Sequence, residues 1–176
     1  MTSANPYLAL IGKLRRRKVS FVLVGVFGLN HYAAGPALAF STLDCDILVE
    51  PKPGNLLRTL LILEADGYDL GTNGEPLGAL DLWLARRIIR NKASVSATKE
   101  KAAQVDILIS VAGYTFFRLY AGRRLFKAGS TSVPVASLAH LIESKRKCGR
   151  KKDLEFLRIY EAQLGRLVNK RGGGIL

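Results

Sequence analysis

The chain has few of the residues that build zinc sites, disulfide frameworks or membrane spans. Its 176 residues include 2 cysteines, Cys45 and Cys148, and 2 histidines. The cysteines lack the paired spacing of zinc ligands, and two thiols are too few for a disulfide framework. No apolar run reaches the roughly 18 residues that a transmembrane helix needs. We therefore expect no zinc site, no disulfide scaffold and no membrane partner.

The overall composition is that of a globular protein. Hydrophobic residues make up 48% and charged residues 23% of the chain, a balance that excludes a disordered polypeptide. The length fits one domain, alone or with a short helical appendage. We expect a core over residues 1–132 and a basic C-terminal helical region, packed on that core, over residues 133–176.

Positive charge is concentrated in the second half of the chain. The net charge is +13. Residues 1–85 hold 7 Lys/Arg and 8 Asp/Glu, whereas residues 86–176 hold 20 Lys/Arg and 6 Asp/Glu. A cationic half of this kind suits a polyanion such as nucleic acid, nucleotide phosphates or an anionic membrane surface.

The N-terminal region imitates a secretory signal peptide. The basic cluster Arg15-Arg16-Arg17-Lys18 precedes an apolar run from Phe21 to Leu29. The cluster comes late, however, after an amphipathic stretch, and Asn30 and His31 interrupt the apolar run. We therefore expect a cytoplasmic protein, which also agrees with two free thiols.

Hydrophobic periodicity predicts an α+β fold: a small mixed β-sheet with helices on one face, followed by a C-terminal helical pair. Glycine and proline set most of the predicted boundaries. The stretch from Ala79 to Arg90 fits either a helix or a strand. The predicted strands cover 19–25, 42–50 and 105–111, and the predicted helices cover 6–18, 26–35, 54–66, 114–122, 133–147 and 151–170, with a loop over 68–79.

Two aspartates stand in one strand where apolar residues are expected. Side chains alternate along a strand, so Asp44 and Asp46 point to one face, about 7 Å apart, while Cys45 points to the other. Two neighbouring carboxylates repel each other and resist desolvation. A divalent cation relieves that cost, and hard carboxylate oxygens suit Mg²⁺ or Mn²⁺.

A third aspartate begins another apolar strand. Asp106 lies in the sequence Val-Asp-Ile-Leu-Ile that starts at Val105. If this strand neighbours the first, three carboxylates converge and suit two divalent ions about 3.5–4 Å apart, as in phosphoryl transfer. The alternative is structural: Asp44 and Asp46 would face solvent on an edge strand, and Asp106 would cap its own strand.

A glycine turn precedes the two-aspartate strand. Gly25 ends a buried strand about twenty residues before Asp44, and Gly28 follows three residues later. A glycine at a strand end lets backbone amides approach phosphate, although the same pattern also serves a tight packing turn.

These segments together resemble the polymerase-β-like nucleotidyltransferase superfamily, and above all its small bacterial stand-alone members, some of which act as toxins. The resemblance is densest in FVLVGVFGLNHYA from Phe21, TLDCDILV from Thr42 and VDIL from Val105. The segment from Val135 to Lys145, followed by GRKKDL from Gly149, is similar to the C-terminal helical pair of that family.

The resemblance implies a role for each of these positions. Asp44, Asp46 and Asp106 would be the metal-holding, catalytic residues, with Asp106 activating the acceptor hydroxyl. The nucleotide-binding set would be Gly25, Val26, Gly28, Lys145, Lys152 and Asp153. One departure stands out, because the residue after Gly25 is Val26, where the family has Gly or Ser.

Further basic residues form candidate nucleic-acid contacts: Arg146, Lys147, Arg150 and Lys151. Arg150 and Lys151 begin a predicted helix, where cations oppose the helix dipole unless an anion binds there. The structural alternative is a solvated basic face, with Asp153 serving only to favour the helix start. We expect Trp83 and Tyr160 to lie in the core.

Three functions compete at this level. The first is metal-dependent transfer of a nucleoside monophosphate from a nucleoside triphosphate to a hydroxyl. The acceptor would be RNA, for example transfer RNA as in the related toxins, and an antitoxin protein would be a further partner. The second is a degenerate binding module for nucleic acid or nucleotide, which Val26 favours. The third is transfer to a small molecule such as an aminoglycoside, which the cationic second half disfavours.

Overall fold

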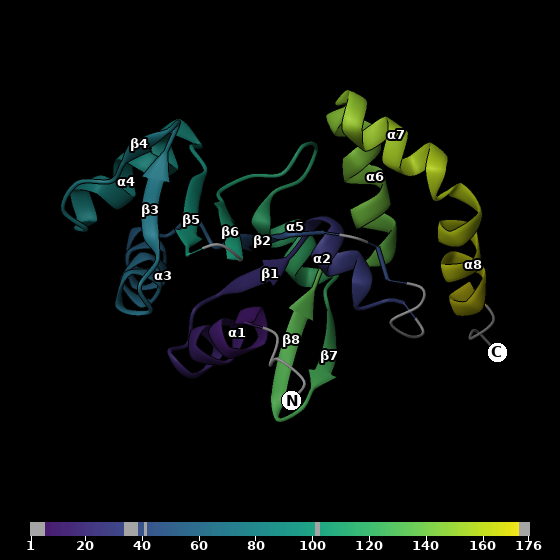
Figure 1. Ribbon diagram of the computed structural model, residues 1–176, viewed down its shortest axis with the longest axis horizontal. Coiled ribbons are helices and arrows are strands. Elements are labelled where there is room, and N and C mark those ends of the chain that lie inside the picture. Colours follow the sequence, from purple (N-terminus) through teal and green to yellow (C-terminus); the bar gives the residue numbers. More distant parts are fainter. Residues whose placement is uncertain (1–5, 34–38, 41, 101–102, 173–176) are drawn as a thin grey trace.

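The computed structural model describes residues 6–33, 39–40, 42–100 and 103–172 (Figure 1). The helices are α1 (Pro6–Arg16), α2 (Gly25–Asn30), α3 (Pro53–Ala65), α4 (Leu82–Asn91), α5 (Phe116–Ala121), α6 (Leu138–Cys148), α7 (Lys151–Ile159) and α8 (Glu161–Gly172). The strands are β1 (Phe21–Leu23), β2 (Asp44–Val49), β3 (Asp69–Thr72), β4 (Glu75–Pro76), β5 (Val95–Lys99), β6 (Ala103–Leu108), β7 (Arg124–Ala128) and β8 (Thr131–Val135).

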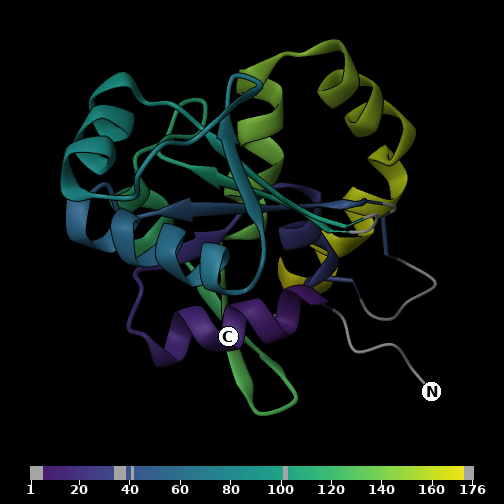
Figure 2. The ribbon, with the colours of Figure 1, turned by 60° about the vertical axis from the view of Figure 1, so that its left-hand side comes forward.

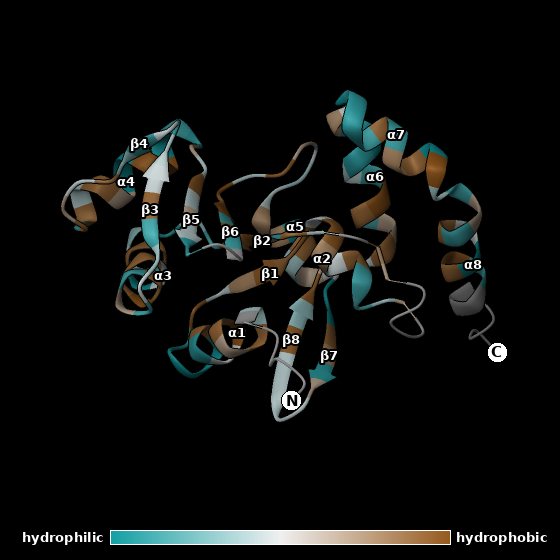
Figure 3. Ribbon diagram, in the orientation of Figure 1, coloured by the Kyte–Doolittle hydropathy of each residue, from teal (hydrophilic) through white to brown (hydrophobic). Residues whose placement is uncertain are grey.

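All these strands join one mixed sheet in the order β4-β3-β5-β6-β2-β1-β8-β7. The pairs β2–β6 and β1–β8 are parallel, and the other neighbouring pairs are antiparallel. The central strands β1 and β2 consist mostly of buried residues, whereas both residues of the edge strand β4 are exposed. Figure 3 shows that β1 is hydrophobic and that the start of α7 is hydrophilic.

Two groups of helices flank the sheet. In both ribbon views α1 and α3 lie side by side, and α6, α7 and α8 lie on the other side of the molecule (Figures 1 and 2). Leu10 and Leu14 of α1 and Leu56, Leu60 and Leu63 of α3 are buried as their spacing predicts, whereas Leu61, Leu154 and Ile159, which the same periodicity assigned to apolar faces, are exposed. The α+β fold class predicted from the sequence is confirmed, but the sheet is larger than expected.

The structure differs from the sequence predictions mainly where strands are short or rich in polar residues. Residues 68–79, expected to be a loop, form the hairpin β3–β4, and Ala79 to Arg90 resolves into α4. The helix predicted to start at Pro134 begins later, because Pro134 lies in β8 opposite Leu125 of β7. The sheet thus extends past residue 132, where we expected the helical region to begin.

The helical predictions near two other points also change. The helix expected over 151–170 is divided at Tyr160 into α7 and α8. The helix expected over 26–35 ends at Asn30, and its predicted last residues, 34 and 35, lie outside the described part of the chain. None of the described helices has the length and hydrophobicity to cross a membrane.

Candidate active site

The three predicted carboxylates lie on two neighbouring parallel strands. In the β2–β6 ladder Asp46 is the register partner of Asp106. Side chains at paired positions of adjacent strands share a face, and Asp44 shares it with Asp46 because strand residues alternate. Cys45 points to the opposite face and is fully buried. All three carboxylates line one cavity of about 520 Å³.

The electrostatic environment of Asp46 disfavours negative charge. Burial, the largest cause, and the neighbouring Asp106 and Asp44 carboxylates together raise the pKa of this carboxyl to about 6, while Lys145 and Arg150 act in the opposite direction. Desolvation and like-charge repulsion are the expected costs of grouped carboxylates. Added positive charge in this cavity would therefore stabilise the ionised form of Asp46.

Asp106 is held in position by polar neighbours on β5 and β6. The Ser96 hydroxyl donates to Asp106 Oδ1 at 2.8 Å, and Gln104 Nε2 donates to Oδ1 and Oδ2 at 3.3 and 3.2 Å. Ser96 is the cross-strand partner of Asp106. The sequence analysis did not identify Ser96. Its position between the buried Val95 and Ala97 is the alternating pattern of a strand, which could have indicated it.

Gly25 lies in direct contact with Asp46. Its φ is +64°, and a Cβ atom built there would come within 1.9 Å of Asp46 Oδ2. Glycine is therefore required twice, for the left-handed backbone and for the space that the carboxylate occupies. The next residue, Val26, also lines the cavity. Gly28 does not, since it faces Leu23 and Val135 inside the fold.

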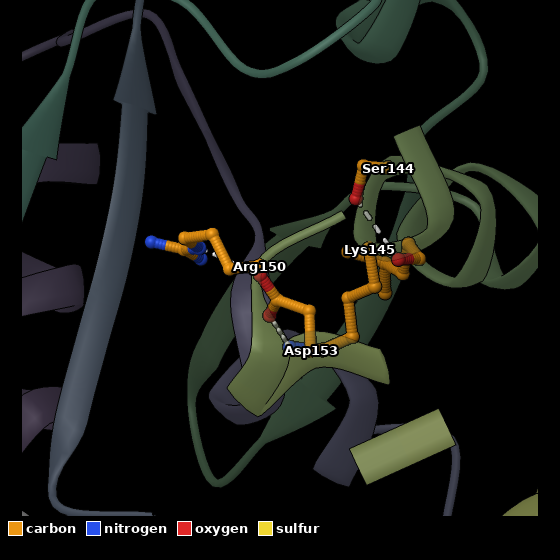
Figure 4. Close-up of polar contacts among 5 residues, drawn as sticks. Ser144, Lys145, Arg150 and Asp153 are labelled. Atoms are coloured by element: carbon orange, nitrogen blue, oxygen red, sulfur yellow. Dashed lines mark hydrogen bonds and ion pairs between the residues drawn. The ribbon is translucent and has the colours of Figure 1, made fainter. Parts of the chain in front are cut away.

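The opposite wall of the cavity comes from α6 and the start of α7. Asp153 is buried and accepts hydrogen bonds from Lys145 Nζ at 3.1 Å and Arg150 Nε at 2.6 Å (Figure 4). Burial alone would raise the pKa of Asp153, but the hydrogen bonds from Arg150 and Lys145 outweigh it and the net shift is downward. One carboxylate thus fixes two cations that face the strand aspartates.

The remaining predicted basic residues divide between the cavity and its surroundings. Lys152 lines the cavity, as Lys145, Arg150 and Asp153 do. Arg146, Lys147 and Lys151 are not among its lining residues. Lys147 forms an ion pair with Glu143 at 3.0 Å and lies 4.5 Å from the centre of the Tyr114 ring. Of the four predicted nucleic-acid contacts, Arg150 is therefore the one that lines the same cavity as the carboxylates.

The donor chemistry of the cavity fits a divalent cation. Three carboxylates supply hard oxygen ligands of the kind that Mg²⁺ and Mn²⁺ prefer, and the charge on Asp46 is disfavoured without a cation. Within the described residues, no three His, Cys, Asp or Glu side chains are already gathered into a ligand cluster.

Comparison with known proteins supports the fold. No family model matches the chain, and no curated protein matches it in sequence. In structure it resembles the lincosamide antibiotic adenylyltransferase LnuA, in a crystal form with lincomycin bound. The two share 14% sequence identity with a TM-score of 0.51, over 78% of this chain and 82% of the other. The chain therefore has a nucleotidyltransferase-like fold.

Proposed function

We propose that this protein is a metal-dependent nucleotidyltransferase. It would transfer a nucleoside monophosphate from a nucleoside triphosphate to an acceptor hydroxyl. The observation that carries this proposal is the arrangement of Asp44, Asp46 and Asp106 on one wall of a cavity whose opposite wall carries Lys145 and Arg150. Carboxylates facing cations across a cavity suit the binding of a metal-complexed polyphosphate.

The protein's own contribution is to position the reactants and to hold charge and protons. Asp44 and Asp46 would hold Mg²⁺ or Mn²⁺, and Asp106 would share in holding it. A bound divalent ion supplies neutralisation of phosphate charge and polarises phosphoryl oxygen. Asp106 would accept the proton of the acceptor hydroxyl at Oδ2, because Ser96 orients Oδ1. The hydroxyl oxygen then bonds to the α-phosphorus, and pyrophosphate leaves.

The triphosphate itself would be held by backbone and cations. Gly25 brings its backbone close to Asp46 without a side chain in between, so the proposed metal ligand lies directly against the turn that would approach the phosphates. Lys145, Arg150 and Lys152 line the same cavity and supply opposite charge. Asp153 neutralises part of that charge, so the triphosphate would meet an ordered and moderately positive wall.

We favour RNA as the acceptor. The second half of the chain carries the excess of basic residues, and a cationic surface attracts polyanions while it repels cationic drugs. A transfer RNA acceptor and an antitoxin-like partner rest on the family resemblance of the sequence alone. A cytoplasmic location would follow, since nucleoside triphosphates and RNA meet there. LnuA is a lincosamide adenylyltransferase, so a small-molecule acceptor belongs in the same assay.

Val26 supports the second candidate, a binding module without turnover. Its branched side chain lines the cavity beside Gly25 and occupies space where a smaller residue would admit phosphate. Comparing the native protein with Val26→Ser separates the two functions. Robust native transfer with little gain from serine supports the enzyme, whereas nucleotide binding without transfer by either protein supports the module.

The deciding experiment is incubation with each labelled nucleoside triphosphate, Mg²⁺ and total RNA, in parallel with lincomycin and an aminoglycoside. We expect label in the RNA with the native protein and none with Asp46→Asn, which is nearly isosteric. Transfer by Asp46→Asn at the native rate contradicts the assigned site. Label in a small molecule alone keeps the reaction but rejects RNA as the acceptor.

A further inference from the structure

The outward face of α4 carries a tryptophan and three arginines in one stripe. Trp83, Arg86, Arg87 and Arg90 are spaced by three and four residues, so they lie on the same side of the helix. All four are exposed, and Trp83 has 64% of its surface accessible. Our expectation that Trp83 belongs to the core is therefore wrong. The reason is the helix register, since Ala85 and Ile88 are the residues that α4 buries.

The charge of this stripe is not neutralised within the protein. Among the described residues, no ion pair involves Arg86, Arg87 or Arg90. The helix contains no acidic residue, and the preceding Asp81 accepts a hydrogen bond from the Leu84 backbone as the N-cap. The guanidinium of Arg87 lies 5.5 Å from the centre of the Trp83 ring. An exposed indole backed by uncompensated arginines is suited to an anionic, aromatic ligand.

The stripe continues toward the candidate active site along the chain. Lys92 follows α4 and is exposed. Three residues beyond Asn91, Ser94 lines the cavity, and Ser96 after it holds Asp106. Three residues span at most about 10 Å, so the end of α4 lies close to the cavity rim. The separation of Trp83 and Arg90 along the helix is also about 10 Å at 1.5 Å per residue.

We propose that this α4 face docks the single-stranded part of an RNA acceptor. A base would stack on Trp83, and the three arginines would contact successive phosphates. The proposal rests on the proposed nucleotidyl transfer and specifies where its acceptor binds. An anionic membrane is the less fitting partner, because Leu82 and Trp83 are the large apolar side chains that α4 exposes, and arginines occupy the rest of the stripe. Stacking on an aromatic ring combined with arginine contacts is the usual mode of single-strand binding.

The test uses the single tryptophan of the chain as its own reporter. A single-stranded RNA of about a dozen nucleotides is titrated into the full-length protein without nucleotide or metal. Saturable quenching of tryptophan emission, weakened by salt, is expected, because Trp83 is the only indole. Absence of quenching overturns the proposal. A spectral shift with phosphatidylserine vesicles but none with RNA overturns it in favour of a membrane surface.

Matched variants separate a local surface from overall charge. With labelled RNA and anisotropy as the readout, Trp83→Ala should weaken binding roughly 5- to 150-fold, and Trp83→Phe should retain most of the affinity. The triple variant R86E/R87E/R90E should bind more weakly and reduce the salt slope by about 2. The control R118E/R124E/K127E changes the same charge at exposed positions of α5 and of the edge strand β7. Equal losses in both triple variants contradict the proposal.

These experiments distinguish failure of the α4 docking surface from failure of the proposed nucleotidyl transfer. If Trp83 emission is quenched by RNA but no triphosphate is ever transferred, the α4 surface stands and the reaction fails. If RNA is labelled at the native rate by Trp83→Ala and by R86E/R87E/R90E, the reaction stands and the α4 surface fails.

Discussion

The two walls of the cavity hold carboxylates in opposite electrostatic situations. On the sheet wall, Asp46 stands beside two other acids, and its pKa is raised to about 6. On the helical wall, Asp153 is buried between Lys145 and Arg150, and its pKa is lowered. The sheet wall therefore gains from any added cation, whereas the helical wall is already satisfied. The grouped acids of the sheet wall destabilise the folded protein, and the ion pairs of the helical wall offset part of that cost.

The largest expected effect is loss of transfer when the sheet wall loses an acid. Asp106→Asn should lower the transfer rate by about 10³-fold or more, because it removes both a cation ligand and the proton acceptor. Label transfer to the acceptor is the measurement. The matched control is Asp69→Asn, an exposed residue of β3, which should retain activity. A similar rate in Asp106→Asn and the native protein would place the chemistry elsewhere.

Gly25→Ala should be the most damaging change to the fold of the site. The new methyl group meets Asp46 Oδ2 and also strains a left-handed backbone, so we expect a loss of about 3–4 kcal/mol in unfolding free energy. Gly74→Ala is the control, because Gly74 has a φ of +82° with no atom near its added Cβ. It should lose only about 1 kcal/mol, and urea unfolding measures both. Equal losses would mean that the contact with Asp46 contributes nothing.

On the helical wall, Asp153→Asn should destabilise the protein by about 3 kcal/mol. It leaves the Lys145 ammonium, which is largely buried, without its carboxylate. Glu155→Gln on the exposed side of the same helix should change stability by less than about 0.5 kcal/mol. The native advantage is present above the ordinary pKa of an aspartate and is lost as pH falls through the lowered pKa of Asp153. Thermal unfolding at pH 7 and pH 3 tests both statements.

Asp46→Asn, by contrast, should stabilise the protein when EDTA has removed any metal. Because the pKa of Asp46 is raised to about 6, the folded state binds its proton more tightly than the unfolded state does. Stability therefore declines as pH rises from about 4 to 6 and stays reduced above that. Asparagine removes this penalty, so we expect a gain of roughly 2 kcal/mol at pH 7.5 and less at pH 5. Added Mg²⁺ should raise the melting temperature of the native protein more than that of the variant. A variant less stable than the native protein at pH 7.5 contradicts this account.

The sheet wall was the more predictable from sequence. Alternation in β2 predicts that Asp44 and Asp46 share a face, whereas Asp106 joins them only because β6 pairs with β2, which the sequence offered as a condition. The close contact between Gly25 and Asp46 was not predictable, since it depends on how α2 packs against β2. Strands β5, β7 and β8 were missed because they are short and carry polar residues or Pro134. Their assignment depends on neighbouring strands rather than on local pattern.

For the helical wall, the sequence predicts only the types of residue that take part. The basic residues and Asp153 stand out in the sequence, but the register of α6 and the turn at Gly149, with φ +63°, together decide which of them line the cavity. Lys145, Arg150 and Lys152 do so, whereas Arg146 and Lys147 do not. Trp83 shows the same limit, since helix register rather than hydrophobicity decided its exposure.

The pairing of β2 with β6 also limits which changes in chain length this protein can tolerate. Asp46 and Asp106 are 60 positions apart and meet only through the ladder register. Deletion of one residue inside β6 puts the segments before and after the gap out of phase, so one of them must turn its side chains to the opposite face of the sheet. The hydrophobic alternation of that segment would be inverted by the same step. Length variation in homologous chains should therefore fall in the loops around this strand pair and spare the pair itself.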